Sequence, residues 1–168
     1  MIGNRILLVD DEELELKAWR KTLEMAGYSV ATRSNPLDAL AECDEHAYDL
    51  VILDFLMPSM TGIELLARIR KKRPLIRSVI ISGKIDKGAD AEALTAEIKS
   101  GVEADRYIHK PVSNSELRQV VAEILSSEPP DEQTWTNIAK KTEKRNRLTI
   151  KSAKNTSKLL RQHVKKKK

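Results

Sequence analysis

The chain of 168 residues is long enough for one ordinary domain with an appendage, and its 40% hydrophobic and 33% charged residues indicate a soluble globular protein. No apolar run approaches the length of a membrane span, and acidic residues stand where a signal peptide would need its apolar segment. The single cysteine, Cys43, excludes an internal disulfide and a cysteine-based zinc site. We therefore expect a reduced, cytoplasmic setting.

The formal net charge of +5 is unevenly distributed along the chain. Residues 128–168 contain 13 Lys and Arg against 4 Asp and Glu, which gives this segment a net charge of +9. Residues 1–127 contain the remaining 17 basic and 21 acidic residues, a net charge of −4. The sequence thus predicts an acidic body, residues 1–127, that carries a basic tail, residues 128–168.

The acidic body alternates short runs of Val, Ile and Leu with segments whose apolar residues recur at helical spacing. Each run is interpreted as a strand and each periodic segment as a helix. The predicted elements in chain order are strand 5–9, helix 12–27, strand 28–33, helix 35–47, strand 49–53, helix 62–74, strand 76–82, helix 89–101, strand 105–109 and helix 113–127.

Five successive strand–helix units of this kind indicate an α/β fold, with an open parallel sheet covered by helices on both faces. With five strands, the flavodoxin-like, doubly wound order 2-1-3-4-5 is the leading topology. The helix boundaries carry their own signals. Gly27 and Pro74 stop two helices, Pro36 suits the first position of another, and Ser113 with Glu116 forms a capping-box pattern.

Polar residues stand where four of the predicted strands end. Asp10 and Asp11 follow the first strand, Asp54 closes the third, Ser82 closes the fourth and Lys110 follows the fifth. In the predicted order these carboxyl ends meet at one edge, where ligands of such sheets bind. An acid at the end of a core strand is costly unless its charge is compensated. We therefore expect the compensating groups to gather around Asp54.

The chemistry of this set favours phosphoryl transfer. Converging carboxylates repel one another and tend to protonate, and a hard cation such as Mg²⁺ relieves that repulsion. Lys110 supplies a compact positive charge that suits one oxygen of an anion. The arrangement suits transfer of a phosphoryl group to a carboxylate, with Asp54 as the nucleophile.

Four segments resemble the receiver domain of two-component response regulators, and the resemblance covers about residues 4–126. They are "LLVDDEE", "LVILDFLMPSMTGIELL", "VIISG" and "YIHKP". The resemblance implies that Asp54 is the phosphoacceptor and that Mg²⁺ is the cofactor. It implies metal binding by Asp11 and Asp54 directly, by Asp10 largely through water, and by the main-chain carbonyl of Leu56.

The resemblance also implies roles for residues near the last predicted strand. Ser82 matches the switch hydroxyl, Tyr107 the switch aromatic and Lys110 the lysine that contacts the phosphoryl group. Pro111 matches a proline whose preceding peptide bond is typically cis in this family. The stretch between Ser82 and Lys110 is a few residues longer than is typical.

The function implied is that of a signalling domain rather than an enzyme, catalysing only its own phosphoryl transfer and slow dephosphorylation. The phosphodonor would be a phosphohistidine on a sensor histidine kinase or a histidine phosphotransfer protein. Phosphorylation would bias a two-state switch on the face formed by residues 89–101, 105–109 and 113–127. A downstream protein target, or a phosphorylation-dependent homodimer, would respond to that face.

Other interpretations stay open at single positions and in the tail. The pair Asp10 and Asp11 could be helix N-terminal acids, and Tyr107 a packed aromatic. The tail is interpreted as a solvated basic extension with no recognised output domain. Its alternative is contact with nucleic acid or an anionic membrane, which would make the protein a DNA-associated regulator. A haloacid-dehalogenase phosphohydrolase is disfavoured, because Leu56 stands where its second acid belongs.

Overall fold

The computed structural model describes residues 4–83 and 102–127. The predicted helix over 89–101 and the basic tail over 128–168 lie outside these residues. The elements along the chain are β1 (Arg5–Val9), α1 (Glu13–Glu24), β2 (Ser29–Arg33), α2 (Pro36–Glu45), β3 (Leu50–Asp54), α3 (Gly62–Lys72), β4 (Arg77–Ser82), β5 (Arg106–His109) and α5 (Asn114–Ser126).

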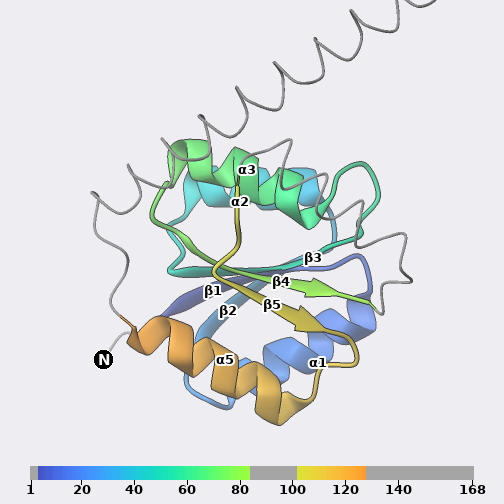
Figure 1. Ribbon diagram of the computed structural model, residues 1–168, viewed down its shortest axis with the longest axis vertical. Helices are drawn as coiled ribbons and strands as arrows, with labels where there is room; N and C mark the ends of the chain where they lie inside the picture. The colour runs from blue at the N-terminus through green and yellow to red at the C-terminus, as the bar shows by residue number, and fades with distance from the viewer. Residues whose placement is uncertain (1–3, 84–101, 128–168) are drawn as a thin grey trace, which may run out of the picture.

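The five strands form one parallel sheet in the order β2-β1-β3-β4-β5, which confirms the predicted topology. Helices α2 and α3 cover one face of the sheet, while α1 and α5 cover the other (Figure 1). The central strands β1, β3 and β4 are therefore covered on both sides, which explains why β3 is an unbroken apolar run up to its final residue.

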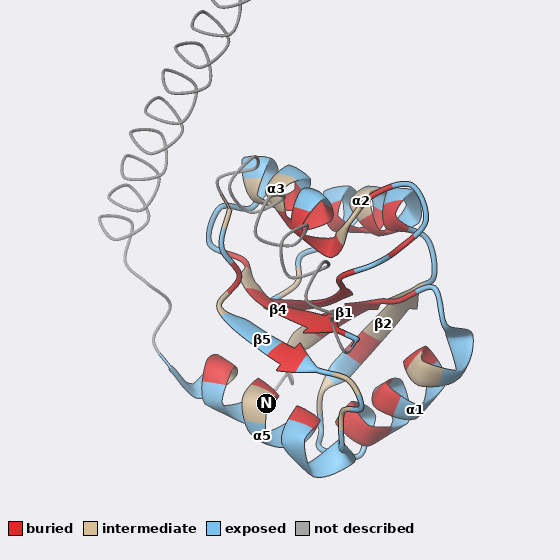
Figure 2. Ribbon diagram, turned by 45° about the vertical axis from the view of Figure 1, so that its right-hand side comes forward, coloured by how far each residue is buried: buried red, intermediate tan, exposed pale blue. Residues whose placement is uncertain are grey.

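Alternate residues of each central strand supply two separate cores. In β1, Leu7 and Val9 pack in the core beneath α2 and α3, whereas Ile6 and Leu8 pack in the core beneath α1 and α5. Figure 2 shows the buried residues concentrated on the central strands and on the inner faces of these helices. None of the helices in the described ranges combines the length and the apolar composition needed to cross a bilayer.

Helix boundaries follow the capping signals of the sequence, with one exception. The Asn35 side chain accepts a hydrogen bond from Leu37 N at the start of α2, and Ser113 Oγ accepts one from Glu116 N at the start of α5. Helix α1, however, ends at Glu24, three residues before the predicted stop at Gly27. Ala26, which lies in the predicted helix, is exposed in the turn that follows α1. Gly27 instead takes a positive φ of 93° in the turn that leads to β2.

Asp105, just before β5, fixes that edge strand against β4 and α3. Its Oδ2 accepts hydrogen bonds from Arg70 Nη2 at 2.9 Å and from Ser78 Oγ at 2.8 Å, and its Oδ1 accepts one from Arg77 Nε at 2.8 Å. All of these groups are largely shielded from solvent. A paired, shielded carboxylate of this kind orders the start of β5, and with it the register that positions Lys110.

Gly62 lies so close to the end of β3 that a larger residue does not fit. A Cβ atom at this position would lie 2.3 Å from the main-chain oxygen of Asp54. We expect Gly62→Ala to force α3 away from β3 and to destabilise the fold by about 2 kcal/mol, lowering the Tm by about 8 °C. Thermal unfolding followed by circular dichroism measures this.

Gly83→Ala is the matched control, because a Cβ at Gly83 meets no heavy atom of the described residues within 4 Å. That variant should melt within about 2 °C of the wild type. Equal Tm values for the Gly62 and Gly83 variants would contradict the close contact between α3 and the phosphoacceptor strand.

Candidate functional site

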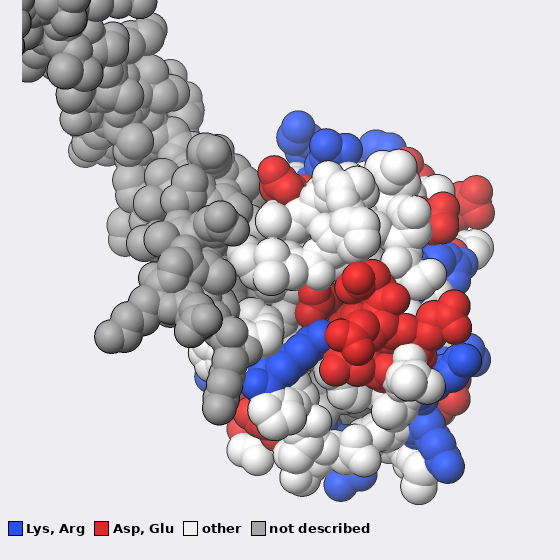
Figure 3. All heavy atoms as spheres, turned by 90° about the vertical axis from the view of Figure 1, so that its right-hand side faces the viewer, with Lys and Arg blue, Asp and Glu red and all other residues white. Residues whose placement is uncertain are grey.

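The parallel sheet brings the polar strand ends to one edge, as the sequence predicts. Val9, just before Asp10, pairs with Leu53, just before Asp54, and Ser82 pairs with His109, just before Lys110. The Lys110 amide also donates a hydrogen bond to the main-chain oxygen of Ser82 at 2.7 Å, which extends the β4–β5 ladder to the lysine. Figure 3 views this edge and shows acidic side chains gathered there.

Lys110 supplies the positive charge that the buried carboxylates need. Its Nζ lies 3.0 Å from Asp10 Oδ2 and 2.9 Å from Asp54 Oδ1, and both acids are buried. A third carboxylate, Glu15 on α1, approaches the same Nζ to 2.6 Å through its Oε2. The cost of placing Asp54 at the end of a core strand is therefore offset in part by one ammonium shared among three acids.

Main-chain amides hold the second oxygen of each buried carboxylate. Glu12 N donates to Asp10 Oδ1 at 2.8 Å, and Leu56 N donates to Asp54 Oδ2 at 2.8 Å. Each acid thus has one oxygen fixed by the loop that follows its strand and the other directed at Lys110. This leaves little freedom for either carboxylate to turn.

Burial and the contacts with Lys110 together set the pKa values of the site. Burial raises the pKa of Asp10 above its ordinary value, against the hydrogen bonds from Glu12 N and Lys110. Burial likewise raises the pKa of Asp54, Lys110 lowers it and the charge of Asp10 raises it further. For Lys110, burial lowers the pKa, but its bonds to Asp54, Glu15 and Asp10 outweigh this, and the net pKa is raised. The lysine therefore stays charged at neutral pH.

The remaining predicted residues lie around this centre at different depths. Ser82 is buried at the end of β4, and its Oγ lies 3.4 Å from His109 Nδ1. Leu56 and Asp11 are exposed. Tyr107 is 38% exposed, and its hydroxyl accepts a hydrogen bond from Ala104 N at 3.2 Å, at the amino end of β5. The Lys110–Pro111 peptide bond is cis, as the resemblance implies.

The chemistry of the carboxylates at this edge fits Mg²⁺. Asp10 and Asp54 present hard carboxylate oxygens to the same point, and the repulsion between them favours a cation there. Mg²⁺ is commonly held by one or two carboxylates together with waters, so this pair fits it in kind. Within residues 4–83 and 102–127, no group of three or more His, Cys, Asp or Glu side chains is arranged as a metal site, and the three acids that converge do so on the Lys110 ammonium. Direct binding by Asp11 therefore stays a prediction.

Sequence reasoning missed two α1 residues that contact Lys110. Glu15 forms the ion pair described above, and the Lys110 ammonium lies 5.5 Å from the centre of the Trp19 ring, within the range of a cation–π contact. The residues are four apart and so lie on one face of α1. The sequence did contain a signal for these contacts. An acid stands one helical turn before a tryptophan, close to the entrance of the predicted site.

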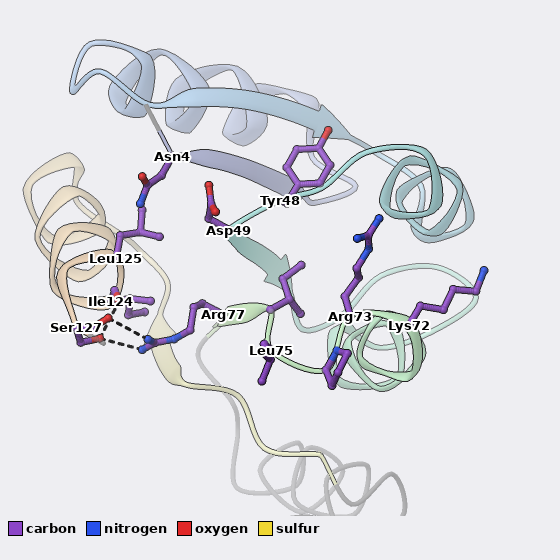
Figure 4. A pocket seen from close by; sticks show the side chains of 12 residues that line it. Asn4, Tyr48, Asp49, Lys72, Arg73, Leu75, Arg77, Ile124, Leu125 and Ser127 are labelled. Atoms are coloured by element: carbon purple, nitrogen blue, oxygen red, sulfur yellow. Dashed lines mark hydrogen bonds between the residues drawn. The ribbon is translucent and has the colours of Figure 1, made fainter. Parts of the chain in front are cut away.

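A cavity of about 490 Å³ lies away from this edge (Figure 4). It is lined by residues at the amino ends of β1, β3 and β4 and at the carboxyl end of α5, among them Asn4, Asp49, Arg77 and Ser127. Arg77 Nη2 donates a hydrogen bond of 3.1 Å to Ser127 Oγ across this cavity. None of the predicted site residues lines it. The predicted site lies at the opposite edge of the sheet.

A doubly wound five-stranded sheet, with two buried carboxylates and a lysine at its carboxyl edge, is the arrangement expected of a receiver domain. Comparison with known families gives the same result, because residues 6–122 match the response regulator receiver domain. The chain belongs to this family, whose members are the signalling domains of two-component systems.

Individual relatives agree with the family assignment. The alginate biosynthesis transcriptional regulatory protein AlgB of Pseudomonas aeruginosa is 37% identical over 72% of this chain and 26% of its own length. The alkaline phosphatase synthesis transcriptional regulatory protein PhoP of Bacillus subtilis is 32% identical over 74% of this chain and 49% of its own. The chain thus spans between a quarter and a half of these relatives.

The fold also matches solved structures. A response regulator receiver domain protein of Methanospirillum hungatei is 30% identical, with a TM-score of 0.64, over 72% of this chain and 92% of that one. The match therefore includes nearly the whole of the solved domain. The receiver fold therefore accounts for the described part of the chain.

Proposed function

We propose that this protein is a response regulator that accepts a phosphoryl group on Asp54 from a phosphohistidine donor. The observation that carries the proposal is the Lys110 ammonium, which lies 2.9 Å from Asp54 and 3.0 Å from Asp10 at the carboxyl edge of the sheet. In the transfer, one carboxylate oxygen of Asp54 forms a bond to phosphorus. The phosphorus–nitrogen bond to the donor imidazole breaks, and that nitrogen keeps the electron pair and later binds a proton.

The residues around Asp54 would have different roles in the transfer, according to their positions. Leu56 N fixes one Asp54 oxygen, and Lys110 is placed to contact an oxygen of the incoming phosphoryl group. Asp10, Asp11, Asp54 and the main-chain carbonyl of Leu56 would hold Mg²⁺. When bound, this ion supplies positive charge that neutralises the phosphoryl oxygens.

Phosphorylation would be transmitted through Ser82 and Tyr107. A phosphoryl group on Asp54 would attract the Ser82 hydroxyl from its place beside His109, and Tyr107 would turn inward from its half-exposed position. This is a local charge change that biases a two-state element. The affected face consists of β5, α5 and the predicted helix over 89–101, which lies outside the described residues.

The partners follow from this role. The donor would be a sensor histidine kinase or a histidine phosphotransfer protein, and the target a downstream protein or a second phosphorylated copy. We further propose the division into a receiver, residues 1–127, and a basic tail, residues 128–168. The tail's net charge of +9 supports a second role in contacting nucleic acid, as do relatives named transcriptional regulators. A contact with anionic membrane would use the same charge.

Incubation with acetyl phosphate, followed by intact-mass measurement, tests the proposed chemistry. With Mg²⁺ present, the wild-type protein should gain the mass of one phosphoryl group. With the metal chelated by EDTA, the uptake should fall by about a hundredfold or more, because the developing charge is then uncompensated. Uptake that is absent with Mg²⁺, or unaffected by EDTA, would contradict the proposal.

A further inference from the structure

The Lys110 ammonium is engaged by a third acid that the phosphoryl-transfer chemistry does not require. Glu15 Oε2 lies 2.6 Å from Lys110 Nζ, nearer than either Asp10 or Asp54. Among the described residues, this buried oxygen has no hydrogen-bond partner of regular geometry, and its charge is met by the ion pair with Lys110. The Glu15 carboxylate therefore depends on Lys110 for its compensation.

Helix α1 contacts the ammonium at two points. Glu15 and Trp19 lie one turn apart on α1, and the Trp19 ring centre is 5.5 Å from Lys110 Nζ. The side chain of Glu15 is 32% exposed and that of Lys110 is 18% exposed, so water screens the pair only in part. The lysine thus lies between helix α1 and the end of β3, in contact with both.

Three carboxylates surround the lysine. Those of Asp10, Asp54 and Glu15 lie 3.0, 2.9 and 2.6 Å from Lys110 Nζ, and Asp10 also accepts a hydrogen bond from it. An ammonium group has three N–H donors, so these acids occupy the positions around it. A phosphoryl oxygen that binds Lys110 must therefore displace one of these contacts. Phosphorylation removes the charge of Asp54 itself, but the charge of Glu15 remains beside the new anion.

We propose that Glu15 competes with the phosphoryl group for Lys110 and so weakens the phosphorylated state of this protein. The inference rests on the proposed function of Asp54. Glu15 acts here as a positioning residue, because it touches the lysine and not the reacting atoms. Its effect has two parts, which are the place beside the ammonium that it occupies and the repulsion between its charge and the phosphoryl oxygens.

Beryllium fluoride, an analogue of a phosphoryl group bound to a carboxylate, provides the test. The full-length protein is saturated with Mg²⁺ and titrated with beryllium fluoride in a calorimeter. We expect Glu15→Gln to bind the analogue about fivefold more tightly than the wild type, since the lost pair is partly exposed. Glu15→Ala should show a gain of similar size.

Glu13→Gln is the matched control, because it removes the same charge from the same helix. Glu13 is 72% exposed and pairs with Lys17 at 3.5 Å, away from Lys110. We expect its affinity to stay within about twofold of the wild type. A gain of affinity separates competition from structural damage, because a damaged site binds the analogue more weakly.

Affinities of the Glu15 variants that equal the control, or fall below it, would overturn the competition while leaving the proposed function intact. A wild-type protein that binds no beryllium fluoride in Mg²⁺ would overturn the proposed function, and the role of Glu15 with it. A gain confined to the two Glu15 variants is the result that the geometry predicts.

Discussion

Replacing Asp54 by asparagine is expected to abolish phosphoryl uptake from acetyl phosphate and to raise the Tm of the metal-free protein at neutral pH. The first effect follows because an amide oxygen does not form the acyl phosphate. The second follows because Asp54 is buried beside Asp10, and both burial and the charge of Asp10 raise its pKa. Ionised Asp54 therefore destabilises the fold, and the neutral amide should raise the Tm by about 3 °C.

The sign of the pH dependence follows from the direction of the pKa shift. A carboxyl group whose folded pKa is raised destabilises the fold fully at pH values above that pKa. The penalty disappears as the pH falls through the folded pKa toward the ordinary value of 3.8. The advantage of Asp54→Asn should thus be largest near neutral pH and vanish in acid. The difference in Tm between Asp54→Asn and the wild type is measured by thermal melts from about pH 4 to about pH 7.5.

Asp38→Asn, an exposed acid on α2, is the control for the loss of one negative charge. It should take up phosphoryl groups like the wild type and show no comparable pH-dependent gain in Tm. Phosphoryl uptake by Asp54→Asn at the wild-type rate would show that another residue is the acceptor.

Replacing Lys110 by methionine is expected to slow phosphoryl uptake about a hundredfold, because it removes the positive charge placed beside the incoming oxygens. It should also lower the free energy of unfolding of the metal-free protein by about 3 kcal/mol, since Asp10 and Asp54 stay buried without their shared partner. Rates come from intact-mass time courses, and stabilities from urea unfolding.

Added Mg²⁺ should restore part of the stability lost in Lys110→Met, because a cation between the two carboxylates replaces the missing charge. Lys17→Met, at an exposed position on α1, is the control and should match the wild type in both measurements. A Lys110→Met protein as stable as the wild type without metal would contradict the compensating role assigned to the ammonium.

The sheet was predictable because its signals are local and mutually consistent. The apolar runs that end at Val9, Leu53 and Ser82 gave the strands, and the alternation with helices gave the parallel order that the structure confirms. Topology alone then placed Lys110 beside Asp10 and Asp54, although 100 residues separate Asp10 from the lysine. The prediction of the site therefore depended on the predicted order of the strands.

The contacts that sequence reasoning missed depend on helix rotation and on pairs between charged side chains. Apart from the four-residue spacing between Glu15 and Trp19, nothing in the local pattern distinguishes Glu15, which contacts Lys110, from Glu13, which faces solvent. The network centred on Asp105 was missed for the same reason, because its partners Arg70 and Arg77 come from other elements. Periodicity gives the buried face of a helix, but the rotamer and the partner of a charged residue at its border come from packing.

The most direct measurement of the central claim locates the phosphoryl group on the chain. After incubation with acetyl phosphate and Mg²⁺, reduction with borohydride converts an aspartyl phosphate into homoserine, and peptide mass spectrometry identifies the changed residue. The account predicts homoserine at position 54 and at no other aspartate. A modified residue elsewhere, or a phosphoryl group that resists reduction as a serine or threonine ester does, would contradict it.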